Sequence, residues 1–126
     1  TVPEKQMDAV TAVSGSGPAY FFLMVEAVVD AGVAAGLPRP VATELAAQTM
    51  AGAAAMLLDR MTESGSGSVV GPLDTSAAQL RASVTSPGGT TAAGLRELER
   101  GGLRSAVASA VEAAKTRSEQ LRITSE

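Results

Sequence analysis

The segment at residues 86–91, Ser-Pro-Gly-Gly-Thr-Thr, contains the groups of this 126-residue chain that are best suited to bind a ligand. It leads into a helix expected at residues 90–100, and a helix N-terminus offers unpaired backbone N–H groups and about half a positive charge. The two glycines let a ligand approach the backbone, and the three hydroxyls both donate and accept hydrogen bonds. The pattern predicts a carboxylate-binding site, with an ordinary capped helix start as the alternative. The candidate binding residues are Ser86, Gly88, Gly89, Thr90 and Thr91.

A second junction between a loop and a helix lies directly before Pro18. It does not match the dinucleotide-binding fingerprint G-x-G-x-x-G, because Tyr20 stands at the third glycine position and no strand leads into it. The junction either faces a ligand or is only a kink between two helical pieces. Its residues are Ser14, Gly15, Ser16 and Gly17.

Two sets of charged residues recur at helical spacing. Glu26 and Asp30 are four residues apart and share a helix face, so they either do acid–base work or bind a metal, or they form the wetter stripe of a buried helix. Arg96, Arg100 and Arg104 also recur every four residues, which indicates either a solvated face or a contact with cofactor phosphates. We expect no metal site, because the chain has neither Cys nor His and the wetter stripe is the favoured interpretation of the acidic pair.

The composition excludes several classes of function. Without Cys and His there is no disulfide scaffold, no thiolate nucleophile and no Ser-His-Asp triad. Thirteen acidic and ten basic residues give a net charge of −3, which argues against nucleic-acid binding. The most apolar run, from Ala19, contains Glu26 and Asp30, so we expect it to be too short and too charged to cross a membrane. A cytoplasmic protein is the expectation.

The pattern predicts an all-α fold, because alanine favours helices and accounts for 24 of the 126 residues. Pro18 and Pro40 suit the first position of a helix, and Gly36 with Pro38 ends one. A short helical piece is expected at residues 6–13. The five predicted helices span residues 18–35, 40–61, 75–83, 90–100 and 103–121.

The first predicted helix is apolar around its whole circumference from Tyr20 to Val29, apart from Glu26. Such a helix needs burial on most of its surface, which a five-helix monomer of this size can hardly supply. We therefore predict an intertwined homodimer. The alternative is a monomeric bundle in which this helix is central.

Several motifs, in order along the chain, resemble the Δ1-pyrroline-5-carboxylate reductases. They include DAVTAVSGSGPAY at residues 8–20 and VTSPGGTT at residues 84–91. Others are DAGV at 30–33, GLPR at 36–39, AQT at 47–49, LE at 98–99, GLRS at 102–105, AVEAA at 110–114 and RS at 117–118. The resemblance covers about residues 8–121 and only the C-terminal half of that family. It implies an Ala-rich helical bundle of the 6-phosphogluconate-dehydrogenase C-terminal-like type.

The resemblance implies an oxidoreductase of proline biosynthesis that reduces the cyclic imine Δ1-pyrroline-5-carboxylate to L-proline. The substrate carboxylate would bind the Ser86 hydroxyl and the N–H groups of Gly89, Thr90 and Thr91. The Thr91 hydroxyl, as the catalytic group, would hydrogen-bond the imine nitrogen. The alternative function is a non-enzymatic helical oligomerisation module.

The resemblance also assigns the cofactor, NADPH or NADH, mainly to an N-terminal Rossmann domain that this sequence lacks. Residues 1–126 would then be the helical dimerisation and substrate-binding domain, inactive in isolation and without a cofactor of its own. The nicotinamide would approach the junction formed by Ser14, Gly15, Ser16 and Gly17. The expected partners are a second copy, a larger ring of dimers and a small imino acid, with no nucleic acid and no membrane.

Overall fold

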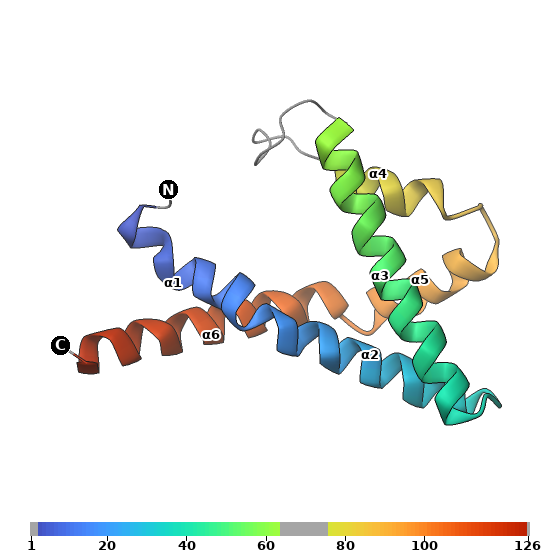
Figure 1. The fold of residues 1–126 in the computed structure, drawn as a ribbon, viewed down its shortest axis with the longest axis horizontal. Helices are drawn as coiled ribbons and strands as arrows, with labels where there is room; N and C mark the ends of the chain where they lie inside the picture. Colours follow the sequence, from blue (N-terminus) through green and yellow to red (C-terminus); the bar gives the residue numbers. More distant parts are fainter. Residues whose placement is uncertain (1–2, 64–75, 126) are drawn as a thin grey trace. The chain divides into compact units, whose positions relative to one another are not determined.

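The computed structural model describes residues 3–63 and 76–125, and every regular element within these residues is helical (Figure 1). The all-α prediction is therefore confirmed for the described part of the chain. The longer helices are α2 (Gly17–Ala34), α3 (Arg39–Glu63), α4 (Ser76–Ser83), α5 (Thr90–Arg100) and α6 (Leu103–Ser125). They follow a 3₁₀ turn (Glu4–Gln6), the single-turn helix α1 (Met7–Val10) and a π-helical turn (Thr11–Gly15).

Glycines end the helices where the sequence predicts. At the end of α2, the Leu37 N–H donates to the Gly32 carbonyl and the Gly36 N–H to the Val33 carbonyl, both at 3.0 Å. This pair of bonds is a Schellman cap, which requires the left-handed backbone that Gly36 adopts with φ of 114°. Gly102, which lies between α5 and α6, also has a left-handed backbone, with φ of 79°. These stops explain why the predicted helix ends agree with the observed ones to within a few residues.

The chain forms two compact units, which we describe separately. One unit comprises Val25–Arg96, and its core is the cluster of Val29, Ala42 and Ala46. A Cβ atom added at Gly32 would lie 3.3 Å from the Ala42 Cβ, so small side chains let α2 and α3 pack closely beside their connecting bend. The extent of the folding domain stays a prediction.

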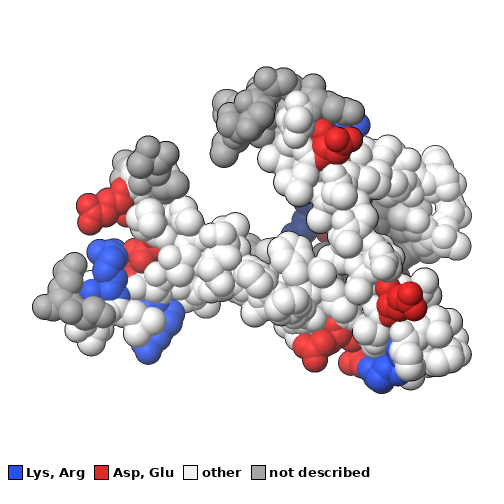
Figure 2. All heavy atoms as spheres, viewed as in Figure 1, with Lys and Arg blue, Asp and Glu red and all other residues white. Residues whose placement is uncertain are grey.

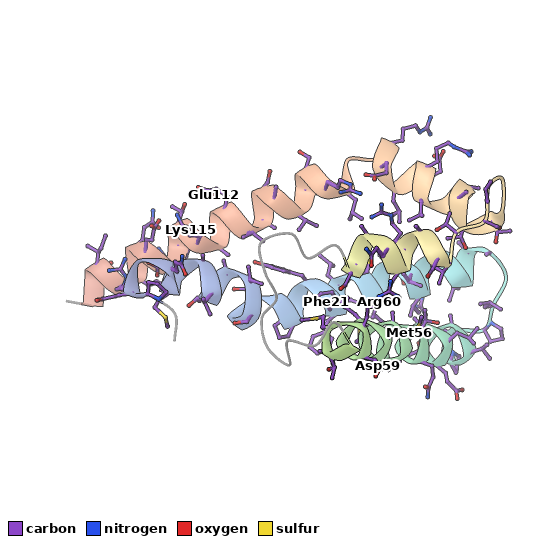
Figure 3. All side chains as sticks on the ribbon, turned by 90° about the horizontal axis from the view of Figure 1, so that it is seen from above. Phe21, Met56, Asp59, Arg60, Glu112 and Lys115 are labelled. Carbon is purple, nitrogen blue, oxygen red and sulfur yellow. The ribbon has the colours of Figure 1, made fainter. Side chains whose placement is uncertain are left out.

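The other unit comprises Thr1–Met24 and Glu97–Glu126. Here α1 and the π-helical turn pack against α6, and both views show them side by side (Figures 1 and 3). Ala12, in the π-helical turn, is completely buried. The first and last described segments of the chain are therefore held together.

Large apolar side chains remain exposed on both long helices at the beginning of the chain. Phe21, Phe22 and Leu23 of α2 are each more than 60% exposed, and Leu58 of α3 is 64% exposed. Most of the face in view in Figure 2 is uncharged. From the sequence we expected that one chain could not bury the apolar surface of the first helix. The exposure of its side chains is consistent with that expectation.

Two helical stretches, Met7–Ala34 and Arg39–Thr62, are long and apolar enough to cross a membrane by length and composition alone. The expectation that the first apolar run is too short was wrong, because helical structure continues through the junction before Pro18. The same length and composition are found in helices buried in protein interiors and interfaces, so this observation is weak evidence for a membrane span.

Candidate functional site

The candidate carboxylate site is a tight turn that leads directly into α5. The Gly89 N–H donates to the Ser86 carbonyl at 3.1 Å, and between them Gly88 has a φ of 73°. Proline at the second position and a left-handed glycine at the third are typical of a type II turn. The Ala93 N–H then donates to the Gly89 carbonyl at 3.1 Å, which is the first bond of the helix.

This geometry decides which backbone N–H groups face outward. The Gly89 N–H is paired within the turn, so in this conformation it is not available to a ligand as the resemblance implied. The N–H groups of Thr90, Thr91 and Ala92 belong to the first turn of α5, where an α-helix provides no acceptor. Three adjacent donors therefore remain at the positive end of the helix.

The absence of a side chain at Gly89 leaves room for the Ser86 hydroxyl. A Cβ atom at Gly89 would lie 2.5 Å from the Ser86 Oγ and 3.3 Å from the Ser86 carbonyl oxygen. The hydroxyl thus lies directly against the start of the helix. Gly88 meets nothing within 4 Å, so its role is to supply the left-handed backbone of the turn.

The hydroxyl groups of this site are open. Ser86, Thr90 and Thr91 are exposed, and within residues 3–63 and 76–125 none of their hydroxyls bonds to another protein atom. In contrast, the hydroxyls of Thr43 and Thr85 donate to the backbone carbonyls four residues before them. The five predicted binding residues therefore come together in one unit, with donors suited to a carboxylate. Their contact with a ligand stays a prediction.

The second predicted segment, at residues 14–17, lies in the other compact unit. The Ser14 hydroxyl donates to the Val10 carbonyl at 2.9 Å, and the Ser16 N–H donates to the Thr11 carbonyl at 2.9 Å, which closes the π-helical turn. Ser14 lines an open, largely apolar hollow of about 460 Å³ with Val10 and Val13. The expected kink is a π-helical turn, and its contact with a cofactor stays a prediction.

A buried polar contact that sequence reasoning missed joins α1 to α6. Asp8 is 6% exposed, and its carboxylate accepts hydrogen bonds from the Ser118 hydroxyl at 2.7 Å and from the Arg122 guanidinium at 2.8 and 3.2 Å. The Arg122 hydrogen bonds, then the one from Ser118, hold the pKa of Asp8 below its usual value, with Lys115 adding a smaller attraction and burial opposing it. The spacing of Ser118 and Arg122 on one face of α6 was the one available signal.

The charged sets behave as surface residues. Asp30 pairs with Arg39 at 3.1 Å across the bend between α2 and α3, and Glu26 is exposed. No group of three or more potential metal ligands occurs among the described residues. These observations favour the wetter stripe over a catalytic acidic pair.

The arginine row does not form a continuous cationic face. Arg100 pairs with Glu97 at 3.0 Å and Arg104 with Glu99 at 2.9 Å, while Arg96 lies in the other compact unit. All three arginines are exposed. A solvated face is therefore favoured over a site for cofactor phosphates.

Residues 4–121 match the family described as pyrroline-5-carboxylate reductase dimerisation. Proteins named pyrroline-5-carboxylate reductase from Mycobacterium leprae and Mycobacterium tuberculosis are 75% and 71% identical over the whole chain, which spans 44% of each. The solved reductase from Coxiella burnetii matches 96% of the chain and 40% of its own length, with a TM-score of 0.80 and 39% identity. The Plasmodium falciparum reductase, solved with NADP bound, matches 94% of the chain and 40% of its own, with a TM-score of 0.78 and 39% identity. The chain, about two fifths as long as these relatives, belongs to the pyrroline-5-carboxylate reductase dimerisation family.

Proposed function

We propose that this chain is the dimerisation and substrate-binding part of a reductase that converts Δ1-pyrroline-5-carboxylate to L-proline with NADPH or NADH. The family membership supports the activity. The observation that carries the proposal is the turn before α5, which presents three backbone donors and three open hydroxyls in one place. A small ring acid with one carboxylate matches that set of donors.

The proposed binding mode uses the geometry of this turn. The substrate carboxylate accepts hydrogen bonds from the N–H groups of Thr90, Thr91 and Ala92 and from the Ser86 hydroxyl. The helix N-terminus adds an attraction to the negative charge. The Thr91 hydroxyl then lies at the edge of the bound acid and donates a hydrogen bond to the ring nitrogen.

Reduction adds a hydride to the imine carbon and a proton, taken from solvent water, to the imine nitrogen, which gives the saturated ring amine. When bound, a reduced nicotinamide supplies that hydride. The chain's own residues hold and orient the imine, so the step needs no His or Cys. The apolar hollow beside Ser14 suits the edge of a flat ring, and NADP is the cofactor bound in the Plasmodium falciparum relative.

A second copy of the chain is the proposed partner. Large apolar side chains that are exposed in one copy indicate a surface that another protein covers. On α2 these are Phe21, Phe22 and Leu23, and on α3 Leu58. Pairing of two copies would remove them from water, and the family is one of dimerisation segments. A further assembly of dimers into a ring belongs to the same proposal.

The test is the Thr91→Ala variant in the full-length protein. Loss of one positioned donor lowers kcat by on the order of 10- to 1000-fold, because that hydrogen bond strengthens as hydride addition builds negative charge on the nitrogen. Steady-state rates with Δ1-pyrroline-5-carboxylate and NADPH measure the effect. The matched control is Thr43→Ala, which removes a threonine hydroxyl that bonds only to the Arg39 carbonyl on α3.

Equal rates for the Thr91→Ala variant and the parent protein would remove Thr91 from the site. A parent protein that fails to reduce the imine would favour the non-enzymatic oligomerisation module. NMR titration with proline separates the two functions further. Shifts confined to residues 86–91 support the site, and their absence supports the module.

A further inference from the structure

The π-helical turn Thr11–Gly15 is an irregular segment placed inside an otherwise continuous helical stretch. It is closed by the Ser16 N–H, which donates to the Thr11 carbonyl five residues earlier at 2.9 Å. A turn of this kind is wider than the α-helix on either side and changes the direction of the chain after it. Its shape therefore sets where the backbone of residues 14–17 lies.

Tyr20 holds this turn from its C-terminal side. The Tyr20 hydroxyl donates to the Ala12 carbonyl at 3.0 Å, eight residues earlier in the chain. Ala12 is completely buried, and a buried carbonyl needs a hydrogen-bond partner. Tyr20 is the single tyrosine of the sequence, and its hydroxyl reaches back from α2 into the turn.

Asp8 holds the same turn from its N-terminal side. It lies in α1, which has only four residues and cannot be stable as an isolated helix. The buried Asp8 carboxylate ties α1 to α6 through the Ser118 hydroxyl at 2.7 Å and the Arg122 guanidinium at 2.8 Å. The π-helical turn is thus fixed at both of its ends by side-chain hydrogen bonds, all within one compact unit.

We propose that Tyr20, Asp8 and Ser118 are positioning residues that hold the π-helical turn in the shape required at the cofactor-facing edge of the active site. The inference rests on the proposed function, which places residues 14–17 beside the nicotinamide. Tyr20 contacts the turn, and Asp8 and Ser118 join α1 to α6. None of the three contacts the substrate in the proposed binding mode. Their loss therefore weakens the use of the cofactor and leaves recognition of the imino acid by residues 86–91 intact.

The experiment compares Tyr20→Phe and Ser118→Ala in the full-length protein, with Ser105→Ala as the matched control. Ser105 is an exposed serine of the same helix α6. We expect Tyr20→Phe to raise KM for NADPH about 3- to 10-fold, the effect of one lost hydrogen bond, while KM for Δ1-pyrroline-5-carboxylate stays within about twofold. Amide hydrogen exchange at residues 12–17 accelerates by a similar factor, and Ser118→Ala shows both effects more weakly.

Two measurements keep this inference separate from the proposed function. In an active parent protein, an unchanged KM for NADPH in both variants overturns the positioning role. If the parent protein does not reduce the imine, the proposed function fails, and hydrogen exchange still decides whether the two side chains hold the turn. Exchange at residues 12–17 that equals that of the Ser105→Ala control overturns the inference in either case.

Discussion

Asp8 shows how one buried carboxylate can make stability depend on pH. Its pKa is lowered in the folded protein, mainly by the hydrogen bonds from Arg122 and then by that from Ser118. In the unfolded chain an aspartate titrates near pH 3.9. Because the folded protein binds this proton less tightly than the unfolded chain, the contact contributes stability above about pH 4 and loses it as the pH falls through the lowered pKa.

We therefore expect Asp8→Asn to lower the Tm at pH 7, because the charge-assisted hydrogen bonds from Arg122 are weakened. The difference from the parent protein should shrink as the pH falls from about 4 through the lowered pKa of Asp8, where the folded parent carboxylate also becomes neutral. Thermal unfolding followed by circular dichroism at several pH values measures this difference. A Tm difference that is the same at pH 7 and at acid pH would contradict the assignment.

At the scale of the elements, the turn before α5 depends on the missing side chain of Gly89. A methyl group there would lie 2.5 Å from the Ser86 Oγ, so the Ser86 hydroxyl must rotate away from the helix start. We expect Gly89→Ala to raise KM for the imino acid about tenfold, the effect of losing one hydrogen bond to a charged group. The measurement is steady-state kinetics of the full-length protein.

Gly94→Ala on the same helix α5 is the control for this prediction. A Cβ atom at Gly94 meets nothing within 4 Å, and alanine favours a helix over glycine by roughly 1 kcal/mol. This variant should keep the parent KM and gain thermal stability. Equal KM values for Gly89→Ala and Gly94→Ala would show that the Ser86 hydroxyl does not bind the substrate.

Most helices could be predicted because their ends have local causes. Gly36 and Gly102 stop helices through their own backbone conformations, and Pro18 opens α2 in the first turn, as its sequence position indicated. The gathering of residues 86–91 at a helix start was also predictable, since it needs only neighbouring residues. The paired state of the Gly89 N–H depends on how the turn closes, which the residue types alone did not settle.

The contacts that escaped prediction are distant or irregular. Ser118 bonds to Asp8 across 110 residues of sequence, and the spacing of Ser118 and Arg122 places them on one face of α6 without identifying Asp8 as their partner. The π-helical turn at Thr11–Gly15 has no signature in its residue types, so a kink was the most that the sequence could predict for the backbone at the junction before Pro18. The hydrogen bond from Tyr20 to Ala12 depends on the shape of that turn, so it could not be predicted either.

At the scale of the whole molecule, the exposed apolar side chains predict that two copies pair. We expect light scattering to give about twice the 12.6 kDa mass of one chain at micromolar concentration.

The variant Phe22→Asp tests where the two copies meet. It places a charge on a side chain that is 64% exposed in one copy, and it should yield monomers because a buried unpaired charge is costly. Glu112→Gln on α6, labelled in Figure 3, is the control that should remain dimeric. A parent protein that is monomeric would contradict the interpretation of α2.

The hydrogen bond between Asp8 and Ser118 also has a consequence for how the protein is made. During translation, Asp8 leaves the ribosome 110 residues before Ser118, the residue of α6 that it must contact. The Asp8 side chain therefore lacks its hydrogen-bond partners until α6 has been synthesised. A stop codon only a few residues upstream of Ser118 would leave that carboxylate permanently without Ser118 and Arg122, although α1 itself had been produced.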